Sequence, residues 1–248
     1  MYTLVLLRHG ESEYNKQNRF TGWTEVPLSE KGIVEAKSAG TIMKEKGFDF
    51  DIVYTSVLKR AIKTMVLALE EMDRMWLQVK KSWRLNEKHY GALQGLNKAE
   101  TAAKYGDEQV LQWRRAYDVR PPLYSDDDIA ELRKEARYAD VSDVKYMKGE
   151  ALQDTVERVI PLWENEIAPD IKAGKRVLIA AHGNSLRGVV KYLDKKTDEE
   201  ILKFNIPTGI HLVYELDEHV TTIKSYYLAD EDALKAAQDA VAKQGKAK

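Results

Sequence analysis

Two short apolar runs, each ending at a histidine, constrain the fold of this chain most strongly. Residues 4–7 lead directly into Arg8 and His9, and residues 177–181 lead into His182. Runs of this length and composition are typical of strands buried on both faces of a parallel sheet. Ligands of such sheets bind beyond the carboxyl ends of the strands. If the two strands are neighbours, the two histidines therefore face each other across one pocket.

The rest of the chain continues an alternation of strands and helices. Ser29 has the position of an N-cap before a helical pattern, and residues 52–54 form a strand pattern before a helix over residues 57–72. Residues 212–216 begin a final hairpin. This order predicts an α/β fold in a single domain over residues 1–248. The central sheet is expected to be mostly parallel, with helices on both faces.

Two segments depart from this alternation. Residues 118–150 contain two consecutive prolines, an acidic run and no sustained apolar period, so we expect a surface excursion or a lid-like insertion over the core. Residues 229–248 form an alanine-rich C-terminal tail with one apolar helical face. We expect this tail to be mobile, above all over residues 244–248.

Composition excludes several classes of protein and site. The chain has no cysteine, which rules out disulfides, a thiolate nucleophile and cysteine-based metal sites. Its formal net charge of −1 provides no global basic field for nucleic acid. No segment is long and apolar enough to span a bilayer. We therefore expect a cytoplasmic protein that binds neither nucleic acid nor membranes.

The residues around the two histidines favour phosphate chemistry over metal chemistry. A zinc site would need a third ligand, and His89, His211 and His219 are poorly placed to supply one. No acidic cluster suggests magnesium either, so we predict no metal site.

Arginine is the more plentiful partner. Arg8 adjoins His9, and Arg60 falls in the first turn of a predicted helix. Guanidinium groups bind phosphate oxygens in bidentate fashion. An imidazole beside a fixed phosphate can attack phosphorus in line, and surrounding cations help to keep that imidazole neutral. The sequence therefore predicts His9 as a nucleophile in phosphoryl transfer.

Longer stretches carry a family resemblance. The pentapeptide at residues 8–12, Arg-His-Gly-Glu-Ser, together with the distant His182 and Gly183, resembles the histidine phosphatase superfamily. Three further stretches resemble its cofactor-dependent phosphoglycerate mutases, namely RFTGW at 19–23, YTSVLKRA at 54–61 and LNEKHYGALQGLNK at 85–98. The likeness runs over nearly the whole chain.

The resemblance implies a reaction and a set of roles. Members of that family interconvert 2- and 3-phosphoglycerate in glycolysis and gluconeogenesis, with 2,3-bisphosphoglycerate as the phosphoryl primer and no metal. It implies that His9 accepts and returns the phosphoryl group. It also implies that Glu87 is the general acid and base, and that His182 stabilises the transition state.

The resemblance further implies which residues bind the anion. The transferring phosphate would be held by Arg8, Asn15, Arg60, Gly183 and Asn184. The rest of the substrate would be bound by Ser12, Thr21, Gly22, Tyr90, Lys98, Arg114 and Arg115. The habits of the family also imply a homodimer or homotetramer.

Two alternatives remain open at this point. The nearest is another histidine phosphatase, which would hydrolyse its phosphohistidine with water. Lys98, Arg114, Arg115 and a closing tail favour a mutase, because they would retain the acid and keep water out. The second alternative is a non-catalytic binding protein. Such a protein would be expected to lack one of the three catalytic side chains, and this chain has them all.

Overall fold

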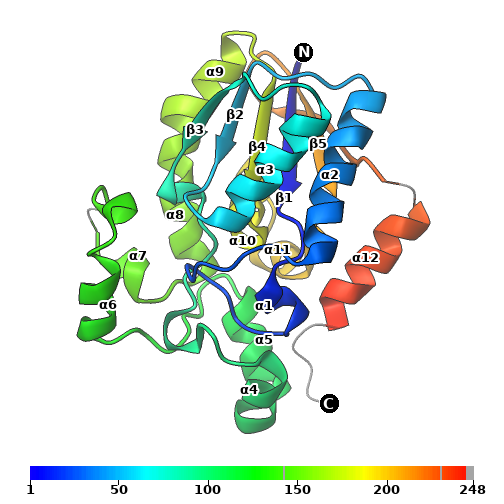
Figure 1. Cartoon of the computed structure of the whole chain (residues 1–248). Helices are drawn as coiled ribbons and strands as arrows, with labels where there is room; N and C mark the ends of the chain where they lie inside the picture. The colour runs from blue at the N-terminus through cyan, green and yellow to red at the C-terminus, as the bar shows by residue number, and fades with distance from the viewer. Residues whose placement is uncertain (142, 230, 244–248) are drawn as a thin grey trace.

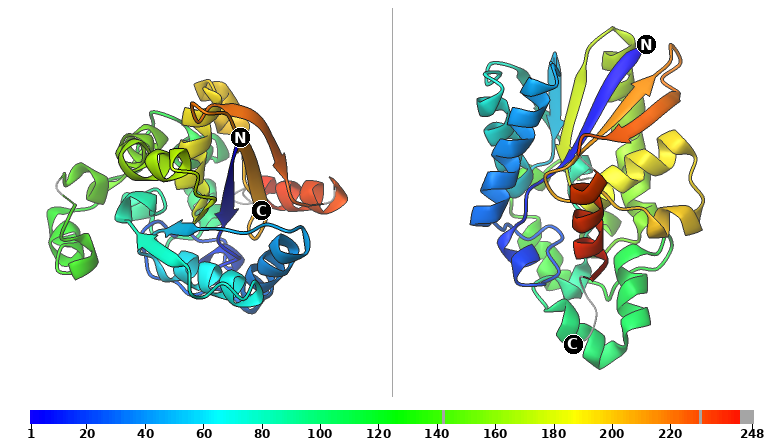
Figure 2. Two further views of the ribbon diagram at one scale, coloured as in Figure 1. Left: turned by 90° about the horizontal axis from the view of Figure 1, so that it is seen from above. Right: turned by 90° about the vertical axis from the view of Figure 1, so that its right-hand side faces the viewer.

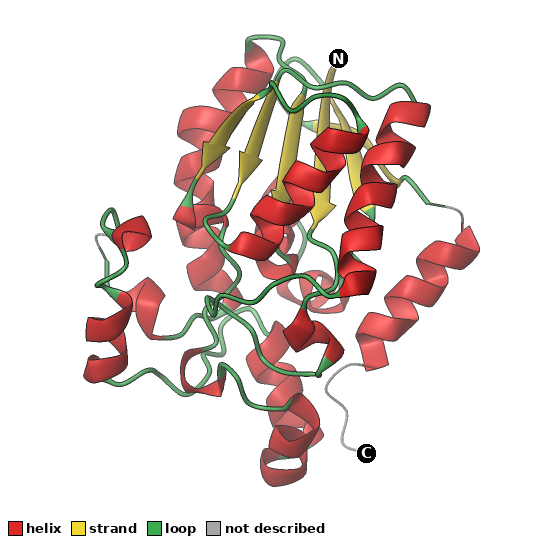
Figure 3. Cartoon of the chain, in the orientation of Figure 1, coloured by secondary structure: helices red, strands yellow, loops and turns green. Residues whose placement is uncertain are grey.

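A six-stranded sheet forms the centre of the molecule. The computed structural model describes residues 1–141, 143–229 and 231–243. The strand order is β3-β2-β4-β1-β5-β6 (Figure 3). The first four strands run parallel to one another, β5 runs antiparallel to its neighbour β1, and β6 runs antiparallel to β5. The strands are β1 (Tyr2–Arg8), β2 (Ile52–Thr55), β3 (Gln78–Lys81), β4 (Val177–Ala181), β5 (His211–Leu216) and β6 (Thr222–Tyr227). The predicted mostly parallel sheet and the final hairpin are both confirmed.

Helices cover both faces of the sheet, as predicted (Figure 1). Alternate residues of β1 point to opposite faces: Leu4 and Leu6 pack with one set of helices, and Val5 and Leu7 pack with the other. The first set contains α8 (Leu152–Leu162), η4 (Trp163–Ile167), α9 (Ala168–Lys172) and α10 (Gly183–Asp194), and the second contains α2 (Glu30–Glu45) and α3 (Lys59–Glu71). Seen from above in Figure 2, the helices lie on either side of the strands.

Local hydrogen bonds explain where two of these helices begin. Ser29 is the N-cap of α2, since its hydroxyl accepts the backbone N–H of Gly32 at 3.1 Å. Helix α3 begins at Lys59, two residues later than predicted. The hydroxyl of Ser56 accepts the N–H of Leu58 and holds residues 56–58 in an extended turn.

Elements below the sheet were not predicted as helices. They are α1 (Glu13–Lys16), η1 (Trp83–Leu85), η2 (Gly91–Leu93), α4 (Lys98–Tyr105), α5 (Asp107–Arg115) and α11 (Asp198–Lys203). In Figure 1, α4 and α5 project from the lower end of the molecule, beyond the carboxyl ends of the parallel strands. They follow strand β3, whose exposed edge sequence Gln-Val-Lys-Lys has no apolar run to reveal it.

Residues 118–150 form a separate excursion that contains α6 (Asp126–Leu132), η3 (Ala136–Tyr138) and α7 (Lys145–Lys148). It packs against Trp23 and Trp83, and the Trp23 ring stacks on Tyr138 with centroids 4.9 Å apart. None of its described residues lines the candidate active-site cavity.

The tail forms α12 (Glu231–Lys243), on the outside of the molecule (Figure 2). Residues 244–248, which were predicted to be mobile, lie outside the described residues.

Candidate active site

The two histidine turns meet because their strands are neighbours. Strands β1 and β4 pair in parallel, with Arg8 opposite Ala181. The N–H of His9 donates to the carbonyl of Ala181 at 3.0 Å. The imidazoles of His9 and His182 therefore face each other, with ring centroids 5.0 Å apart and an edge-to-face orientation.

Hydrogen bonding fixes which nitrogen of His9 can act as a nucleophile. Nδ1 lies 2.6 Å from the carbonyl of Gly10, which can only accept, so Nδ1 carries the proton. Nε2 then holds the lone pair, and the Nε–H of Arg60 points at it from 3.3 Å. Burial, with help from Arg60 and Arg8, lowers the pKa of His9 well below its usual value. The ring is therefore neutral at neutral pH.

His182 offers a second buried imidazole. Its Nε2 lies 2.7 Å from the hydroxyl of Ser56. Its Nδ1 is buried without a hydrogen-bond partner among the described residues. An unpaired buried nitrogen carries a desolvation cost that an incoming phosphoryl oxygen could relieve.

Close backbone approaches explain the glycine after each histidine. A Cβ at Gly10 would lie 2.2 Å from the carbonyl oxygen of Gly32 at the start of α2, which no side chain permits. A Cβ at Gly183 would lie 3.3 Å from the guanidinium carbon of Arg8. Gly10 therefore lets the start of α2 pack closely against this turn, and Gly183 leaves room for the guanidinium of Arg8 beside His9.

Arg8 and Arg60 are held by backbone carbonyls. Arg60 is 1% exposed and donates to Gly22 at 2.7 Å and to Thr24 at 3.1 Å. Arg8 donates to Ile206 at 2.7 Å. Both guanidinium groups are thus fixed in place before any ligand arrives, which favours an anion at this point.

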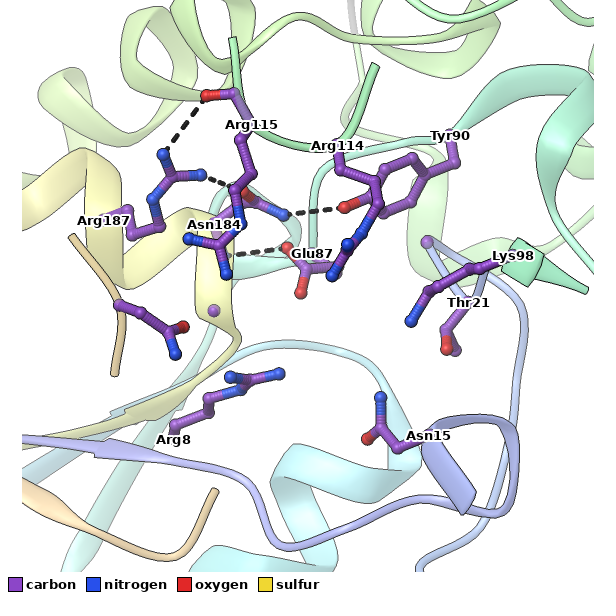
Figure 4. A pocket seen from close by; sticks show the side chains of 13 residues that line it. Arg8, Asn15, Thr21, Glu87, Tyr90, Lys98, Arg114, Arg115, Asn184 and Arg187 are labelled. Atoms are coloured by element: carbon purple, nitrogen blue, oxygen red, sulfur yellow. Dashed lines mark hydrogen bonds between the residues drawn. The ribbon is translucent and has the colours of Figure 1, made fainter. Parts of the chain in front are cut away.

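The Glu87 carboxylate points into the same space (Figure 4). Its Oε1 accepts the backbone N–H of Lys88 at 2.8 Å and that of Asn184 at 3.0 Å. The backbone N–H of Asn184, in a turn that is predicted to bind phosphate, therefore contacts Glu87 in this structure. The side-chain amide of Asn184 donates to the hydroxyl of Tyr90 at 3.2 Å.

Most of the predicted site residues line one cavity, drawn in Figure 4. The lining comprises Arg8, Asn15, Thr21, Gly22, Glu87, Tyr90, Lys98, Arg114, Arg115, Gly183, Asn184, Arg187 and Asn205. His9, His182 and Arg60 are buried next to it, with exposures of 2% or less. Ser12 is not among the residues that line the cavity. It is fully buried as the N-cap of α1, and its hydroxyl bonds Asn15.

The cavity is crowded with cations. The pKa of Lys98 falls well below its usual value because of burial and of repulsion from Arg114 and Arg8. Burial and repulsion from a neighbouring arginine likewise lower the pKa of Arg115 to about 10 and that of Arg187 to about 9. An anion with several charges would relieve this repulsion. Among the described residues, no group of three or more histidine, cysteine, aspartate or glutamate side chains could hold a metal ion.

Comparison with known proteins agrees with this geometry. The model of the histidine phosphatase superfamily (branch 1) matches residues 4–139 and 124–228. The chain belongs to the histidine phosphatase superfamily. It is therefore an enzyme of the phosphatase and mutase class. No helix in the described ranges is long and apolar enough to cross a membrane.

Solved structures of two phosphatases share the fold. A mycobacterial glucosyl-3-phosphoglycerate phosphatase, in complex with VO3, is 25% identical with a TM-score of 0.67. The match covers 87% of this chain and 93% of that chain. The α-ribazole phosphatase of Shigella flexneri is 21% identical with a TM-score of 0.64, over 90% of this chain and 94% of that chain.

Three residues of this histidine phosphatase site were missed in the sequence. Arg187 lies on α10, four residues after Gly183, and donates to the side-chain oxygen of Asn184 at 2.7 Å. Its helical spacing from the histidine turn was an available signal. Ser56 was interpreted as a helix cap, and Asn205 gave no signal because it comes from a distant loop.

Lys88 is a buried cation behind the site of this histidine phosphatase. Its Nζ donates to the carbonyls of Trp113 at 2.6 Å and Arg114 at 3.3 Å, at the carboxyl end of α5. Burial, together with repulsion from Arg187, lowers the pKa of Lys88 to about 7.

This shift predicts a pH dependence of stability. An unfolded lysine titrates near ~10.4, so between about pH 7 and pH 10 the unfolded chain binds a proton that the folded chain does not. The Lys88 contribution to the free energy of unfolding should therefore rise with pH across this window. Urea unfolding should show that Lys88→Met loses this rise, whereas the exposed Lys63→Met keeps it. Parallel curves for wild type and Lys88→Met would contradict the prediction.

Proposed function

We propose that this enzyme interconverts 2- and 3-phosphoglycerate through a phosphohistidine at His9, which 2,3-bisphosphoglycerate primes. The observation that carries the proposal is the number of cations that surround one cavity. Arg8 and Arg60 lie beside His9, and Lys98, Arg114 and Arg115 line the same cavity from α4 and α5. One transferring phosphate would need only some of these cations. A second phosphate or a carboxylate on the same small molecule would account for the others.

In the first half of the reaction, Nε2 of His9 attacks the phosphorus of 2,3-bisphosphoglycerate. The bond from phosphorus to the leaving oxygen breaks, and that oxygen takes a proton from Glu87. Arg8 and Arg60 neutralise the phosphoryl oxygens, and His182 faces the transfer from the other strand end.

In the second half, a hydroxyl of bound 3-phosphoglycerate attacks the phosphohistidine. The P–N bond breaks, its electron pair returns to Nε2, and the hydroxyl proton passes to the Glu87 carboxylate. The product is 2,3-bisphosphoglycerate again. After turning in the pocket, it returns its other phosphoryl group to His9 and leaves 2-phosphoglycerate. Cations on both walls would hold the acid through this turn.

A second candidate is a phosphatase for a phosphorylated small acid. The solved structure at 25% identity is a glucosyl-3-phosphoglycerate phosphatase, and such an enzyme would use the same nucleophile and acid. The difference lies in whether water or a retained hydroxyl accepts the phosphoryl group.

A coupled assay of the full chain separates the two candidates. With 3-phosphoglycerate as substrate, we expect 2-phosphoglycerate to form rapidly once a trace of 2,3-bisphosphoglycerate is added, and slowly without it. Release of inorganic phosphate should be much slower than isomerisation. If release of inorganic phosphate dominates and 2,3-bisphosphoglycerate has no effect, the protein is a phosphatase and the proposed mutase function is wrong.

A further inference from the structure

One fully buried ion pair takes no direct part in the proposed reaction. Arg158 of α8 and Glu150, just before that helix, are both 0% exposed. Nε of Arg158 donates to Oε1 of Glu150 at 2.6 Å, and a terminal nitrogen donates to Oε2 at 3.0 Å. Their location, directly behind the segment that carries Glu87, suggests a specific purpose.

The remaining donors of Arg158 all point at that segment. One terminal nitrogen donates to the carbonyl of Arg84 at 2.5 Å. The other, which also bonds Glu150, shares its second N–H between the carbonyls of Asn86 at 3.0 Å and Glu87 at 2.9 Å. These carbonyls lie in or just after the short helix η1, where the ladder of helical hydrogen bonds has ended. One guanidinium therefore binds several backbone acceptors of this segment, including the carbonyl of Glu87.

Glu150 holds the other side of the same segment. Its Oε2 accepts the N–H of His89 at 2.7 Å, and its own N–H donates to the carbonyl of His89 at 2.8 Å. The indole N–H of Trp23 adds a second donor to the carbonyl of Glu87, at 2.6 Å. The backbone is thus fixed on both sides of Glu87.

Stability alone is a poor explanation for this pair. Removing two charges from water costs so much that buried ion pairs are often no more stabilising than apolar residues of the same volume. The distribution of contacts is also selective, because all the carbonyls that Arg158 reaches lie in residues 83–87. Only arginine presents enough N–H donors in a rigid plane to serve them together.

We propose that Arg158 and Glu150 are positioning residues that set the backbone of residues 84–89 so that the Glu87 carboxylate meets the leaving oxygen of the substrate. The inference rests on the proposed function, in which Glu87 is the acid and base. The carboxylate itself is oriented by the N–H groups of Lys88 and Asn184, which both donate to Oε1. A small displacement of the segment would therefore move it away from both the amides and the substrate.

The test compares two phosphoryl donors that differ in their need for an acid. The phosphoglycerate alkoxide that leaves 2,3-bisphosphoglycerate must be protonated, whereas the nitrophenolate that leaves p-nitrophenyl phosphate is stable without a proton. We expect Glu87→Gln to lower the rate of His9 phosphorylation by 2,3-bisphosphoglycerate far more than the rate with p-nitrophenyl phosphate. Arg158→Lys keeps the charge. It should lower the ratio of the rate with 2,3-bisphosphoglycerate to the rate with p-nitrophenyl phosphate by about tenfold.

Controls separate positioning from folding. Partial unfolding lowers both rates in proportion and leaves their ratio unchanged. Arg120→Lys is the control, because Arg120 also pairs with a carboxylate, that of Asp154, at 2.6 Å, and both of these guanidinium hydrogen bonds go to Asp154 and not to residues 83–89. Its ratio should equal that of the wild type. In the double variant, Glu87→Gln with Arg158→Lys, the ratio should not shift further than in Glu87→Gln alone.

Each outcome has a separate meaning. If Glu87→Gln has the same ratio of rates as the wild type, Glu87 is not the general acid and the proposed reaction is wrong. A biased ratio in Glu87→Gln but not in Arg158→Lys would overturn the positioning role alone. If Arg158→Lys does not fold, Glu150→Gln decides in its place, since it keeps the volume of the side chain and an oxygen for the His89 amide.

Discussion

Replacement of His9 by alanine is expected to abolish the phosphoenzyme and to lower phosphoryl transfer by about 10⁴-fold or more. The Nε2 of this ring holds the lone pair and accepts the Nε–H of Arg60 at 3.3 Å, and the imidazole of His182 lies 5.0 Å away between ring centroids. Incubation with labelled 2,3-bisphosphoglycerate should give an acid-labile, base-stable phosphate on the wild type and none on the variant.

A second histidine provides the control for this experiment. The side chain of His219 is 79% exposed, in the turn between β5 and β6. His219→Ala should be labelled as fast as the wild type. Full mutase activity in His9→Ala would show that the nucleophile has been assigned to the wrong residue.

The second large effect is expected at Glu87. Glu87→Gln keeps the shape of the side chain and an oxygen for the amides of Lys88 and Asn184, but it cannot exchange a proton. General acid and base catalysis contributes roughly 10²–10⁴-fold, so kcat should fall by about that factor while KM changes little. Steady-state kinetics of isomerisation measure both. A raised KM with an unchanged kcat would instead make Glu87 a binding residue.

The core of this site could be predicted because its signals are local. The apolar runs before His9 and His182 are short, complete and followed by glycine, so they identify two parallel strand ends without reference to the rest of the chain. Their adjacency could only be stated as a condition, because the pairing of β1 with β4 joins segments more than 160 residues apart in the sequence, and the pairing is visible only in three dimensions.

The parts that sequence patterns missed depend on burial of charge. Arg158, Arg187 and Glu150 resemble ordinary surface residues of charged helical segments, since burial of an ionised side chain leaves no mark on the sequence around it. Strand β3 was missed for a related reason, because its lysines lie at an edge of the sheet.

The excursion over residues 118–150 has a closed base. Ala92 donates to the carbonyl of Pro122 at 2.9 Å, and Tyr124 donates to that of Lys148 at 2.7 Å. The two ends of the excursion are therefore joined to each other and to the segment after Glu87. Each doubling in the length of a flexible loop costs only about 0.6 kcal/mol of closure free energy. Evolution could thus lengthen, shorten or replace the tip around α6 while the chemistry stays intact, which makes this tip a natural place for relatives to diverge and for engineers to insert new sequence.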